Sequence, residues 1–436
     1  MLVMVPVFAC LALLSATLLV WQWIAAARFH LQPPPDPASP APAATARHPQ
    51  LSHPLPPVSI SVLKPVTGSD PGTAEALASW LRFHSQPAHS VEVLFGVGST
   101  EDPAHALVLQ LLDRHPNATA RLVVCPRHHA LNRKVAKLIH LAREARGDVV
   151  IISDADVAAP PHLLNESIPL LDSPGTGLVH CLYRISKADT PANRWEAFVV
   201  NADFWSQVLQ NRSFRPVDFA LGAVMILRRT TVDAVGGFEA LANVLADDNR
   251  LGRLVVDQGL RTVLSPVVVD CIAAPAGWKE VWRHQLRWAV TIRVCQPGAY
   301  FLSILANGTL WPILWGASAG SGPAIPLAAL LIGFRVVQAI SLESRFTGTP
   351  RKWASAWLPP VKDLLQVGLW VSAFLKNHIV WRGARYRVNP DGTLQPALSQ
   401  FKPPAPPSAS APASGKPPDT DDALAGSGIG IPRGKR

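Results

Sequence analysis

The hydrophobic pattern of the chain begins with an almost uninterrupted apolar run over residues 2–27, which contains no Lys, Arg, Asp or Glu. Such a run can cross the hydrocarbon core of a membrane as a helix, since a crossing takes about 20 residues. A cleaved signal peptide would place basic residues before a shorter apolar core, whereas the first basic residue here, Arg28, follows the run. We therefore expect a retained anchor, with the following chain on the cytoplasmic side that basic residues favour.

A Pro-rich segment follows, and after it strand-like and helix-like patterns alternate. Residues 31–57 are crowded with Pro, Ala and Ser, a composition that stays extended, so we expect a linker there. The apolar strand-like runs beyond it are 58–63 (VSISVL), 91–97 (VEVLFGV), 121–125 (RLVVC) and 149–153 (VVIIS). Their alternation with helical patterns predicts an α/β fold with a mostly parallel sheet and crossover helices.

Three apolar stretches lie towards the end of the chain. Residues 299–318 and 323–342 are each long enough to span a bilayer and are joined by a short turn, so we expect a transmembrane hairpin. The third stretch has only about a dozen uncharged residues between Asp363 and Lys376, too few to span. Basic clusters on both sides of it favour the cytoplasmic face, which indicates an interfacial or re-entrant helix. Residues from about 402 onward are rich in Pro, Ala, Ser and Gly, which predicts disorder.

Composition narrows the classes of function. The 436 residues suffice for a catalytic domain with appendages. The formal net charge of +10 is spread along the chain, and no motif combines basic with aromatic residues as nucleic-acid-binding modules do. An anionic membrane surface or a phosphorylated ligand explains the charge better. The five cysteines show neither metal-ligand nor disulfide spacing, so we expect a reduced compartment and no zinc site.

Two carboxylates follow the strand predicted at 149–153. Asp154 and Asp156 stand at its carboxyl end, where open α/β sheets place ligand sites. Together they can hold a hard divalent cation, Mg²⁺ or Mn²⁺, that also binds the oxygens of a nucleotide diphosphate. An acid pair after a strand is equally typical of a turn with an Asp helix cap, and the pattern alone does not separate the two.

A second acid pair, Asp247 and Asp248, precedes Leu251, Leu254 and Val255, whose helical spacing predicts that the pair opens a helix. One interpretation is that the acids complement the helix dipole. The other is that one of them is a general base for an acceptor hydroxyl.

A Trp-rich helical stretch, RHQLRW at 283–288, comes just before the membrane segments. The guanidinium of Arg287 is suited to paired contacts with phosphate oxygens. Trp288 can stack on a sugar or pack against the domain. Together with Trp278 and Trp282 it can also be an anchor at a membrane interface.

Several separated motifs occur in a consistent order between about residues 58 and 300. They are LKPVTGSDPG, EDPA, NRKVAKL, DAD, GLVHCLYR, GAVMILRRTTVDAVGGF, LADDNRLG and RHQLRW. In this order the chain resembles the ceramide glucosyltransferase-like family, a membrane-bound branch of the inverting glycosyltransferases with the GT-A fold. Within that family it looks most similar to bacterial members associated with hopanoid biosynthesis.

The resemblance implies roles for individual acids. Asp102 in EDPA matches the first acidic motif, in the nucleotide-binding half. Asp154 and Asp156 match the DxD motif that holds the metal and the diphosphate. Asp248 matches the presumed catalytic base, with Asp247 beside it where relatives often have Glu.

The resemblance also implies a set of nucleotide-sugar contacts. Arg287 and Trp288 match the closing pair of the family's (Q/R)xxRW motif, and Lys134 in NRK matches a family position, although a solvated helix lysine explains it equally well. The expected nucleotide-sugar-binding residues are Lys64, Asp102, Lys134, Asp154, Asp156, His284, Arg287 and Trp288.

The chain departs from the family pattern in two places. Counted back from Arg287, the Gln or Arg position holds His284, so either His284 makes that contact or one of its neighbours does after a shift of one residue. Residues 196–219 differ from what a ceramide enzyme would carry where acceptor contacts are expected. A hopanoid polyol or another polar-headed lipid is therefore as good an acceptor as ceramide, and the donor is UDP-glucose or a UDP-N-acetylhexosamine.

Two other classes share part of the pattern. A haloacid-dehalogenase-like phosphatase also has a strand ending in DxDxV, but that strand is normally the first of its domain, and its later acid pair follows a strand. A processive polysaccharide synthase shares the acids and the RW pair but needs more membrane spans to form a channel.

The expected function is inverting transfer of a hexose or N-acetylhexosamine from a UDP-sugar to a membrane-lipid hydroxyl, by a multi-pass inner-membrane protein whose catalytic domain is cytoplasmic. The expected parts are an anchor (1–28), a Pro-rich linker (29–57), a GT-A domain (58–298), a membrane hairpin with an interfacial or re-entrant helix (299–400) and a disordered tail (401–436).

Overall fold

The structure is a computed structural model that describes residues 4–32, 57–86, 89–126, 129–320, 322–381 and 384–396. All of these belong to one unit of the chain. Most of the Pro-rich linker and the whole tail expected at 401–436 lie outside the described residues, so extension of the one and disorder of the other stay predictions.

An eight-stranded sheet organises the chain between residues 58 and 272, in the order β3-β2-β1-β4-β7-β6-β8-β5. Its strands are β1 (Val58–Pro65), β2 (His89–Val97), β3 (Ala120–Val124), β4 (Val149–Ser153), β5 (Val157–Ala158), β6 (Thr176–Ser186), β7 (Val224–Arg228) and β8 (Arg261–Ile272). The first four strands are parallel, whereas β7 is antiparallel to both β4 and β6. All four runs expected as strands form β1 to β4, and the expected α/β fold with a mostly parallel sheet is confirmed.

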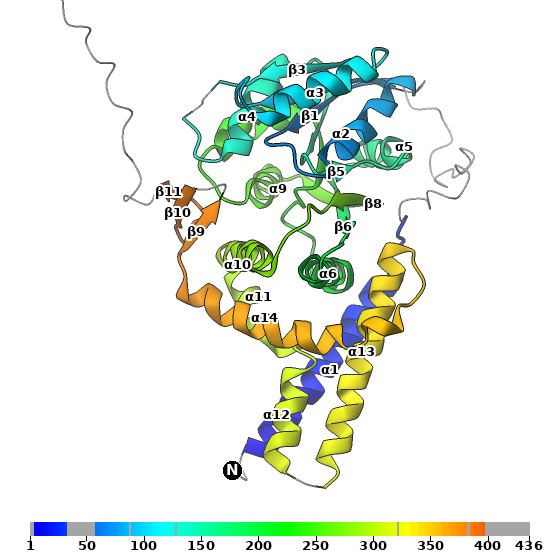
Figure 1. Ribbon diagram of the computed structural model, residues 1–436, viewed down its shortest axis with the longest axis vertical. Coiled ribbons are helices and arrows are strands. Elements are labelled where there is room, and N and C mark those ends of the chain that lie inside the picture. Colours follow the sequence, from blue (N-terminus) through cyan, green and yellow to red (C-terminus); the bar gives the residue numbers. More distant parts are fainter. Residues whose placement is uncertain are drawn as a thin grey trace, which may run out of the picture. The chain divides into compact units, whose positions relative to one another are not determined.

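Helices cover both faces of this sheet (Figure 1). Alternate residues of β4 belong to different hydrophobic clusters: Val149 and Ile151 pack with α2 and α3, whereas Val150 and Ile152 pack with α4 and α9. This follows from the two-residue period of a strand, which explains why β4 is apolar throughout. The covering helices are α2 (Thr73–Leu81), α3 (Pro103–Arg114), α4 (Arg133–Glu144), α5 (Leu163–Ser167), α8 (Arg229–Ala234) and α9 (Asp247–Asp257).

A second helical group packs beside the sheet. It contains α6 (Pro191–Phe198), a π-helical turn (Val199–Phe204), α7 (Trp205–Phe214) and α10 (Trp278–Cys295). The expected helix at 283–288 is thus part of α10, which packs against α6 and against α14 (Leu358–Leu375).

Among the described residues, two helices are long and apolar enough to cross a membrane: α1 (Met4–Arg28) and α13 (Ala324–Thr347). Both pack with each other and with α12 (Leu310–Ala319), and the three lie side by side in Figure 1. α1 also packs against α7 of the second helical group, beside the sheet. The membrane-type helices and the α/β region are therefore joined by direct contacts.

The expected first arm of the hairpin, 299–318, is not one helix. Here α11 (Pro297–Leu302) and a 3₁₀ turn (Ser303–Ala306) end before α12 begins. Asn307 Oδ1 accepts the backbone N–H of Leu310 (2.8 Å), which starts a new helix, and Gly308 packs so closely that an added Cβ would lie 2.6 Å from Leu19. The ten residues of α12 rise only about 15 Å, half of a hydrocarbon core, so 299–318 does not form one spanning helix, and a membrane hairpin at this place stays a prediction.

The final described segment differs from the sequence-based expectation in two ways. Lys362 and Asp363, expected to flank an interfacial or re-entrant helix, are buried within α14. A three-stranded antiparallel sheet follows, made of β9 (His378–Trp381), β10 (Ala384–Val388) and β11 (Leu394–Pro396). It was not foreseen, although the alternation of exposed Arg385 and Arg387 with buried Tyr386 and Val388 has the period of a half-buried strand.

Candidate active site

A cavity of about 610 Å³ lies where β1 and β4 end, at the carboxyl edge of the parallel strands. α9 and α10 supply other parts of its wall. Seven of the expected site residues line it: Lys134, Asp154, Asp156, Asp248, His284, Arg287 and Trp288. Asp247, which had no assigned contact, lines it as well. Residues separated by more than 150 positions in the sequence are thus brought together by the fold.

Lys134 joins the two acid pairs. Its Nζ lies 2.8 Å from Asp154 Oδ1 and 3.0 Å from Asp247 Oδ2. The helix that carries it begins at a side-chain cap, because Asn132 Oδ1 accepts the N–H of Lys134 at 3.0 Å. Burial disfavours the ammonium charge, but the charges of Asp154 and Asp247 outweigh burial and raise the pKa of Lys134. Lys134 is therefore a charged cross-link within the site rather than a solvated helix lysine.

Asp248 lies at the start of α9, as expected, and faces the cavity. Its Oδ1 accepts the backbone N–H of Asn249 at 2.8 Å. Burial, followed by the charge of Asp247, raises the pKa of Asp248 to about 6, although the charge of Lys134 acts in the opposite direction. A carboxyl with this pKa is mostly ionised at neutral pH and still basic enough to accept a proton. Gly222 packs so closely that an added Cβ would lie 3.0 Å from Asp248 Oδ2.

Lys64 is fully buried beneath the DAD loop and does not line the cavity. Its Nζ donates to Ser153 Oγ and to the backbone oxygen of Val157, each at 3.1 Å, and also to the backbone oxygen of Asp154. Burial lowers the pKa of Lys64 to about 7, although the charges of Asp156 and Asp154 oppose this. Its contacts fix the backbone that carries the two acids.

Asp102 likewise stands behind the cavity wall rather than in it. One of its carboxylate oxygens caps α3 by accepting the N–H of Ala104 at 3.0 Å, and the same oxygen accepts the N–H of Gly68 at 2.8 Å. Gly68 has φ +71°, a conformation that favours glycine. Asp102 thereby holds the turn after β1, whose Thr67 and Asp70 do line the cavity.

The DxD acids suit a divalent cation. The side chain of Asp154 is 39% exposed and Asp156 is open to the cavity. Enclosure by the surrounding chain, followed by the neighbouring charge of Asp154, raises the pKa of Asp156. Within the described part of the chain, no three acidic, His or Cys side chains form a ready-made metal site. Two carboxylates with the remaining positions left to phosphate and water is the donor set typical of Mg²⁺.

α10 presents His284, Arg287 and Trp288 to the cavity, whereas Gln285 is buried. His284 Nδ1 lies 2.5 Å from Glu196 Oε1, a hydrogen-bond distance, so this contact leaves Nε2 as the other ring nitrogen. Gln285 Nε2 donates to the same oxygen at 3.0 Å. The register of α10 therefore gives the cavity position of the family motif to His284.

Two cavity residues escaped the sequence analysis. Glu196, on α6, orients His284, but it lies in a segment that matches no motif. Trp381, on β9, lines the cavity, and the Arg287 guanidinium lies 6.0 Å from the centre of its ring. The period-2 pattern of the small sheet could have indicated a strand at Trp381, though not its place beside Arg287.

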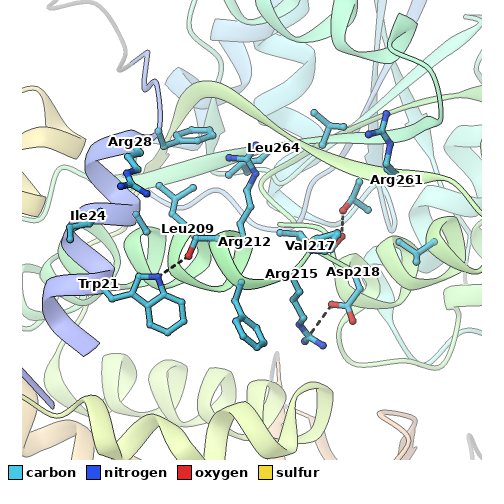
Figure 2. A pocket seen from close by; sticks show the side chains of 18 of the residues that line it. Trp21, Ile24, Arg28, Leu209, Arg212, Arg215, Val217, Asp218, Arg261 and Leu264 are labelled. Carbon is cyan, nitrogen blue, oxygen red and sulfur yellow. Dashed lines mark hydrogen bonds and ion pairs between the residues drawn. The ribbon is translucent and has the colours of Figure 1, made fainter. Parts of the chain in front are cut away.

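A separate cavity of about 660 Å³ contains none of the expected site residues (Figure 2). It lies between α1, α7 and the start of β8, where Trp21 Nε1 donates to Ser213 Oγ at 3.0 Å. No lining residue is shared with the cavity that holds the acids. The acids, Lys134 and Arg287 therefore define the candidate active site.

Comparisons with known proteins identify the family of the chain. The model of glycosyl transferase family 21 matches residues 7–394. Ceramide glucosyltransferase 1 of Caenorhabditis elegans is 22% identical over 355 residues, which cover 79% of this chain and 75% of the relative. An N-acetylglucosaminyltransferase of Sinorhizobium fredii is 22% identical over 245 residues, which cover 53% of this chain and 57% of the relative.

Among solved structures, the mannosyltransferase PcManGT from Pyrobaculum calidifontis, in complex with GDP-Man and Mn²⁺, aligns with a TM-score of 0.45 and 20% identity. The alignment covers 82% of this chain and 99% of that one. Because the family match extends over most of its length, the chain belongs to glycosyl transferase family 21 and is a ceramide glucosyltransferase-like glycosyltransferase.

Proposed function

We propose that this glycosyltransferase is inverting and dependent on a divalent cation, and that it transfers a hexose or N-acetylhexosamine from a UDP-sugar to a membrane-lipid hydroxyl. The observation that carries the proposal is the assembly of Asp154, Asp156 and Asp248 around one cavity, with Lys134 between them. Such a reaction requires acidic side chains that hold the metal, here Asp154 and Asp156, and one that accepts the proton, here Asp248.

Asp248 is the general base. The acceptor hydroxyl gives its proton to the Asp248 carboxylate while its oxygen forms a bond to the anomeric carbon. The bond from that carbon to the diphosphate oxygen breaks at the same time, and UDP leaves with the electron pair. Attack from the side opposite the leaving group inverts the anomeric configuration. A pKa of about 6 keeps Asp248 ionised for this role at neutral pH.

The leaving group is held by other residues of the cavity. Asp154 and Asp156 would hold Mg²⁺ or Mn²⁺, which neutralises charge on the diphosphate when bound. Lys134 and Arg287 supply fixed positive charges on the same cavity wall. Trp288 offers a flat apolar face for the sugar, and His284 offers Nε2, because its Nδ1 is taken by Glu196.

A retained membrane anchor and a cytoplasmic catalytic domain complete the proposal. Gln22 of α1 donates to Ser206 Oγ of α7 at 2.7 Å, which supports α1 as a lasting part of the fold rather than a removed signal. Arg28 at the end of α1 and Arg345 near the end of α13 support an orientation with the catalytic region inside the cell, at the inner membrane.

The acceptor is a lipid with a free hydroxyl, either a hopanoid polyol or a ceramide-like lipid. The hopanoid assignment comes from the sequence resemblance. The ceramide alternative is supported by the name of the Caenorhabditis elegans relative, and an N-acetylhexosamine donor by that of the Sinorhizobium fredii relative.

The test is an assay on membranes from cells that express the full chain, with UDP-glucose or UDP-N-acetylglucosamine and each lipid class. We expect sugar transfer with Mn²⁺ or Mg²⁺, and a loss of at least about 10³-fold in Asp248→Asn, the order of effect of removing a catalytic base. Asp257→Asn, at the other end of the same helix, is the matched control. Equal transfer by Asp248→Asn would remove Asp248 from the role of base.

A further inference from the structure

A third cavity, of about 660 Å³, adjoins the active site on the side of the membrane-type helices. Its walls come from α1, the π-helical turn and α7, α10, the 299–307 segment, α13 and α14. The break between α11 and α12, which removed the expected first hairpin arm, contributes residues 302–307 to this wall. The same irregularity that shortens a membrane helix therefore helps to form a cavity.

This cavity and the active site share three lining residues: Phe204, Trp288 and Ile292. The ring centres of Phe204 and Trp288 are 6.3 Å apart, and Trp288 lies 4.7 Å from the His284 ring in the active site. Phe204 ends the π-helical turn, an irregularity that often occurs at functional sites. The two cavities thus meet at an aromatic boundary.

Charges on the wall of this cavity cancel. Arg335 contacts Asp203 at 2.7 Å and Asp363 at 3.0 Å, and Lys362 contacts both acids, Asp363 at 2.9 Å. These four side chains are at most 4% exposed. They are the only charged residues that line the cavity within the described part of the chain, so its wall has two positive and two negative charges.

The rest of the wall is apolar or carries uncharged amides. The apolar residues include Leu14, Leu18, Leu302 and Leu305, which come from α1 and the 302–305 segment. The amides, which both donate and accept hydrogen bonds, are Gln22, Gln207, Gln210, Asn211, Gln285, Asn307 and Gln366. Such a wall can contact apolar chains and form hydrogen bonds with neutral polar groups. An anionic group would find no unpaired basic side chain among the described residues of this wall, because Arg335 and Lys362 are paired with acids.

We propose that this cavity is the acceptor site and that it selects a neutral lipid with a hydroxylated head over an anionic phospholipid. The apolar part of the lipid lies against α1 and the 302–305 segment, and the head extends past the Phe204 and Trp288 rings towards Asp248. This inference rests on the proposed function, because it supplies the hydroxyl that Asp248 deprotonates. It adds a binding site for the acceptor and a preference of that site for neutral over anionic lipids, which is called the charge rule below.

The test uses the full chain in phosphatidylcholine nanodiscs with two photoreactive, alkyne-bearing lipids that share one acyl chain: a ceramide, which is neutral and hydroxylated, and a phosphatidic acid. After irradiation, labelled peptides are mapped by mass spectrometry. We expect the ceramide probe to label residues 297–307 or 205–214, and the phosphatidic acid probe to label them at least about tenfold less, equal to 1.4 kcal/mol. Equal labelling by both probes would overturn the charge rule.

Filling the cavity tests its location. Ala299→Trp and Gln207→Trp place bulk on exposed wall positions of α11 and α7. Gly298→Trp is the matched control, because Gly298 does not line the cavity and a Cβ added there meets nothing within 4 Å. We expect the first two variants to lower ceramide labelling and to raise the KM for the lipid about tenfold, with UDP binding and the KM for the UDP-sugar unchanged. Gly298→Trp should match the unmodified protein.

Two results separate this inference from the proposed function. If both Trp variants transfer sugar with an unchanged KM for lipid, the cavity is not the acceptor site and the proposed function stands. If no lipid accepts sugar but the ceramide probe still labels the cavity and is displaced by Ala299→Trp, the cavity binds neutral lipid and the proposed transfer reaction is wrong.

Discussion

Trp288 lines both the active-site cavity and the third cavity, which lies on the side of the membrane-type helices and is called the membrane-side cavity below. The two cavities differ in how far their charged side chains compensate one another. In the active site, Asp154, Asp156, Asp247 and Asp248 face one another, and Lys134 compensates for only part of their charge. In the membrane-side cavity two acids and two bases form ion pairs with one another. The difference supports the proposal that an added cation completes the first cavity, whereas the charges of the second compensate one another without a ligand.

The largest expected effect comes from removing the divalent cation that we propose for the active site. Chelation with EDTA should abolish sugar transfer, and Mn²⁺ or Mg²⁺ should restore it, because a cation neutralises the diphosphate as it leaves. Asp156→Asn should lower the rate by about 10³-fold even with excess metal, since it removes one of the two carboxylate ligands. Radiolabelled sugar transfer at a series of Mn²⁺ concentrations checks both.

Full activity of Asp156→Asn in EDTA would mean that Lys134 and Arg287 alone balance the diphosphate. The proposed difference between the two cavities would then be wrong, because neither of them would need an added cation.

The next effect concerns the balanced charges. Lys362→Met should destabilise the protein by about 3–5 kcal/mol, because it leaves Asp203 and Asp363 with a single buried partner. Thermal unfolding in nanodiscs measures this. Lys376→Met, at an exposed position directly after α14, is the control and should change stability by less than about 0.5 kcal/mol. Equal stability of the two variants would show that the charges are not a closed network.

A smaller effect is the pH dependence of the active site. In the proposed reaction Asp248 accepts a proton only when it is ionised, and its pKa is raised to about 6. kcat/KM should therefore be level above this value and fall about tenfold per unit as the pH drops below it. The residual activity of Asp248→Asn should lack this limb. If kcat/KM of Asp248→Asn decreases over the same pH range, another group is responsible for the titration.

The smallest expected effect is at the residue that no motif indicated. Trp381→Ala removes the ring beside the Arg287 guanidinium, a cation–π contact that contributes about 0.5–1 kcal/mol at exposed sites. The KM for the UDP-sugar should rise about two- to fivefold, with the KM for the lipid unchanged. Steady-state kinetics with each substrate varied in turn provides the measurement. A change confined to the lipid KM would place Trp381 with the membrane-side cavity instead.

The sequence predicted those elements and site residues that are encoded by a contiguous pattern, and it did not predict those that depend on contacts between distant segments. β4 and the acids after it, the helix opened by Asp247 and the helix that carries Arg287 were all predicted, because each is encoded by a contiguous pattern and motif. Phe204, Glu196 and Trp381 reach the cavities only through long-range packing, and no local period indicates their neighbours.

Two errors had the same origin. The apolar content of 299–318 predicted one long helix, but Asn307 and Gly308 interrupt it through a cap and a close approach to α1 that composition does not reveal. Lys362 and Asp363 were expected to bound a helix because charges avoid lipid. They lie inside α14 because Asp203 and Arg335, distant in sequence, compensate for them.

The central claim is that the paired acids transfer sugar to a membrane lipid, and mass spectrometry of the total lipid extract tests it most directly. Cells that express the unmodified chain are compared with cells that express Asp248→Asn at equal protein levels. The account predicts a lipid whose mass is increased by one hexose or N-acetylhexosamine in the first extract, and its absence from the second. The same glycolipid in both extracts, or in neither while a sugar appears on a soluble product, would contradict it.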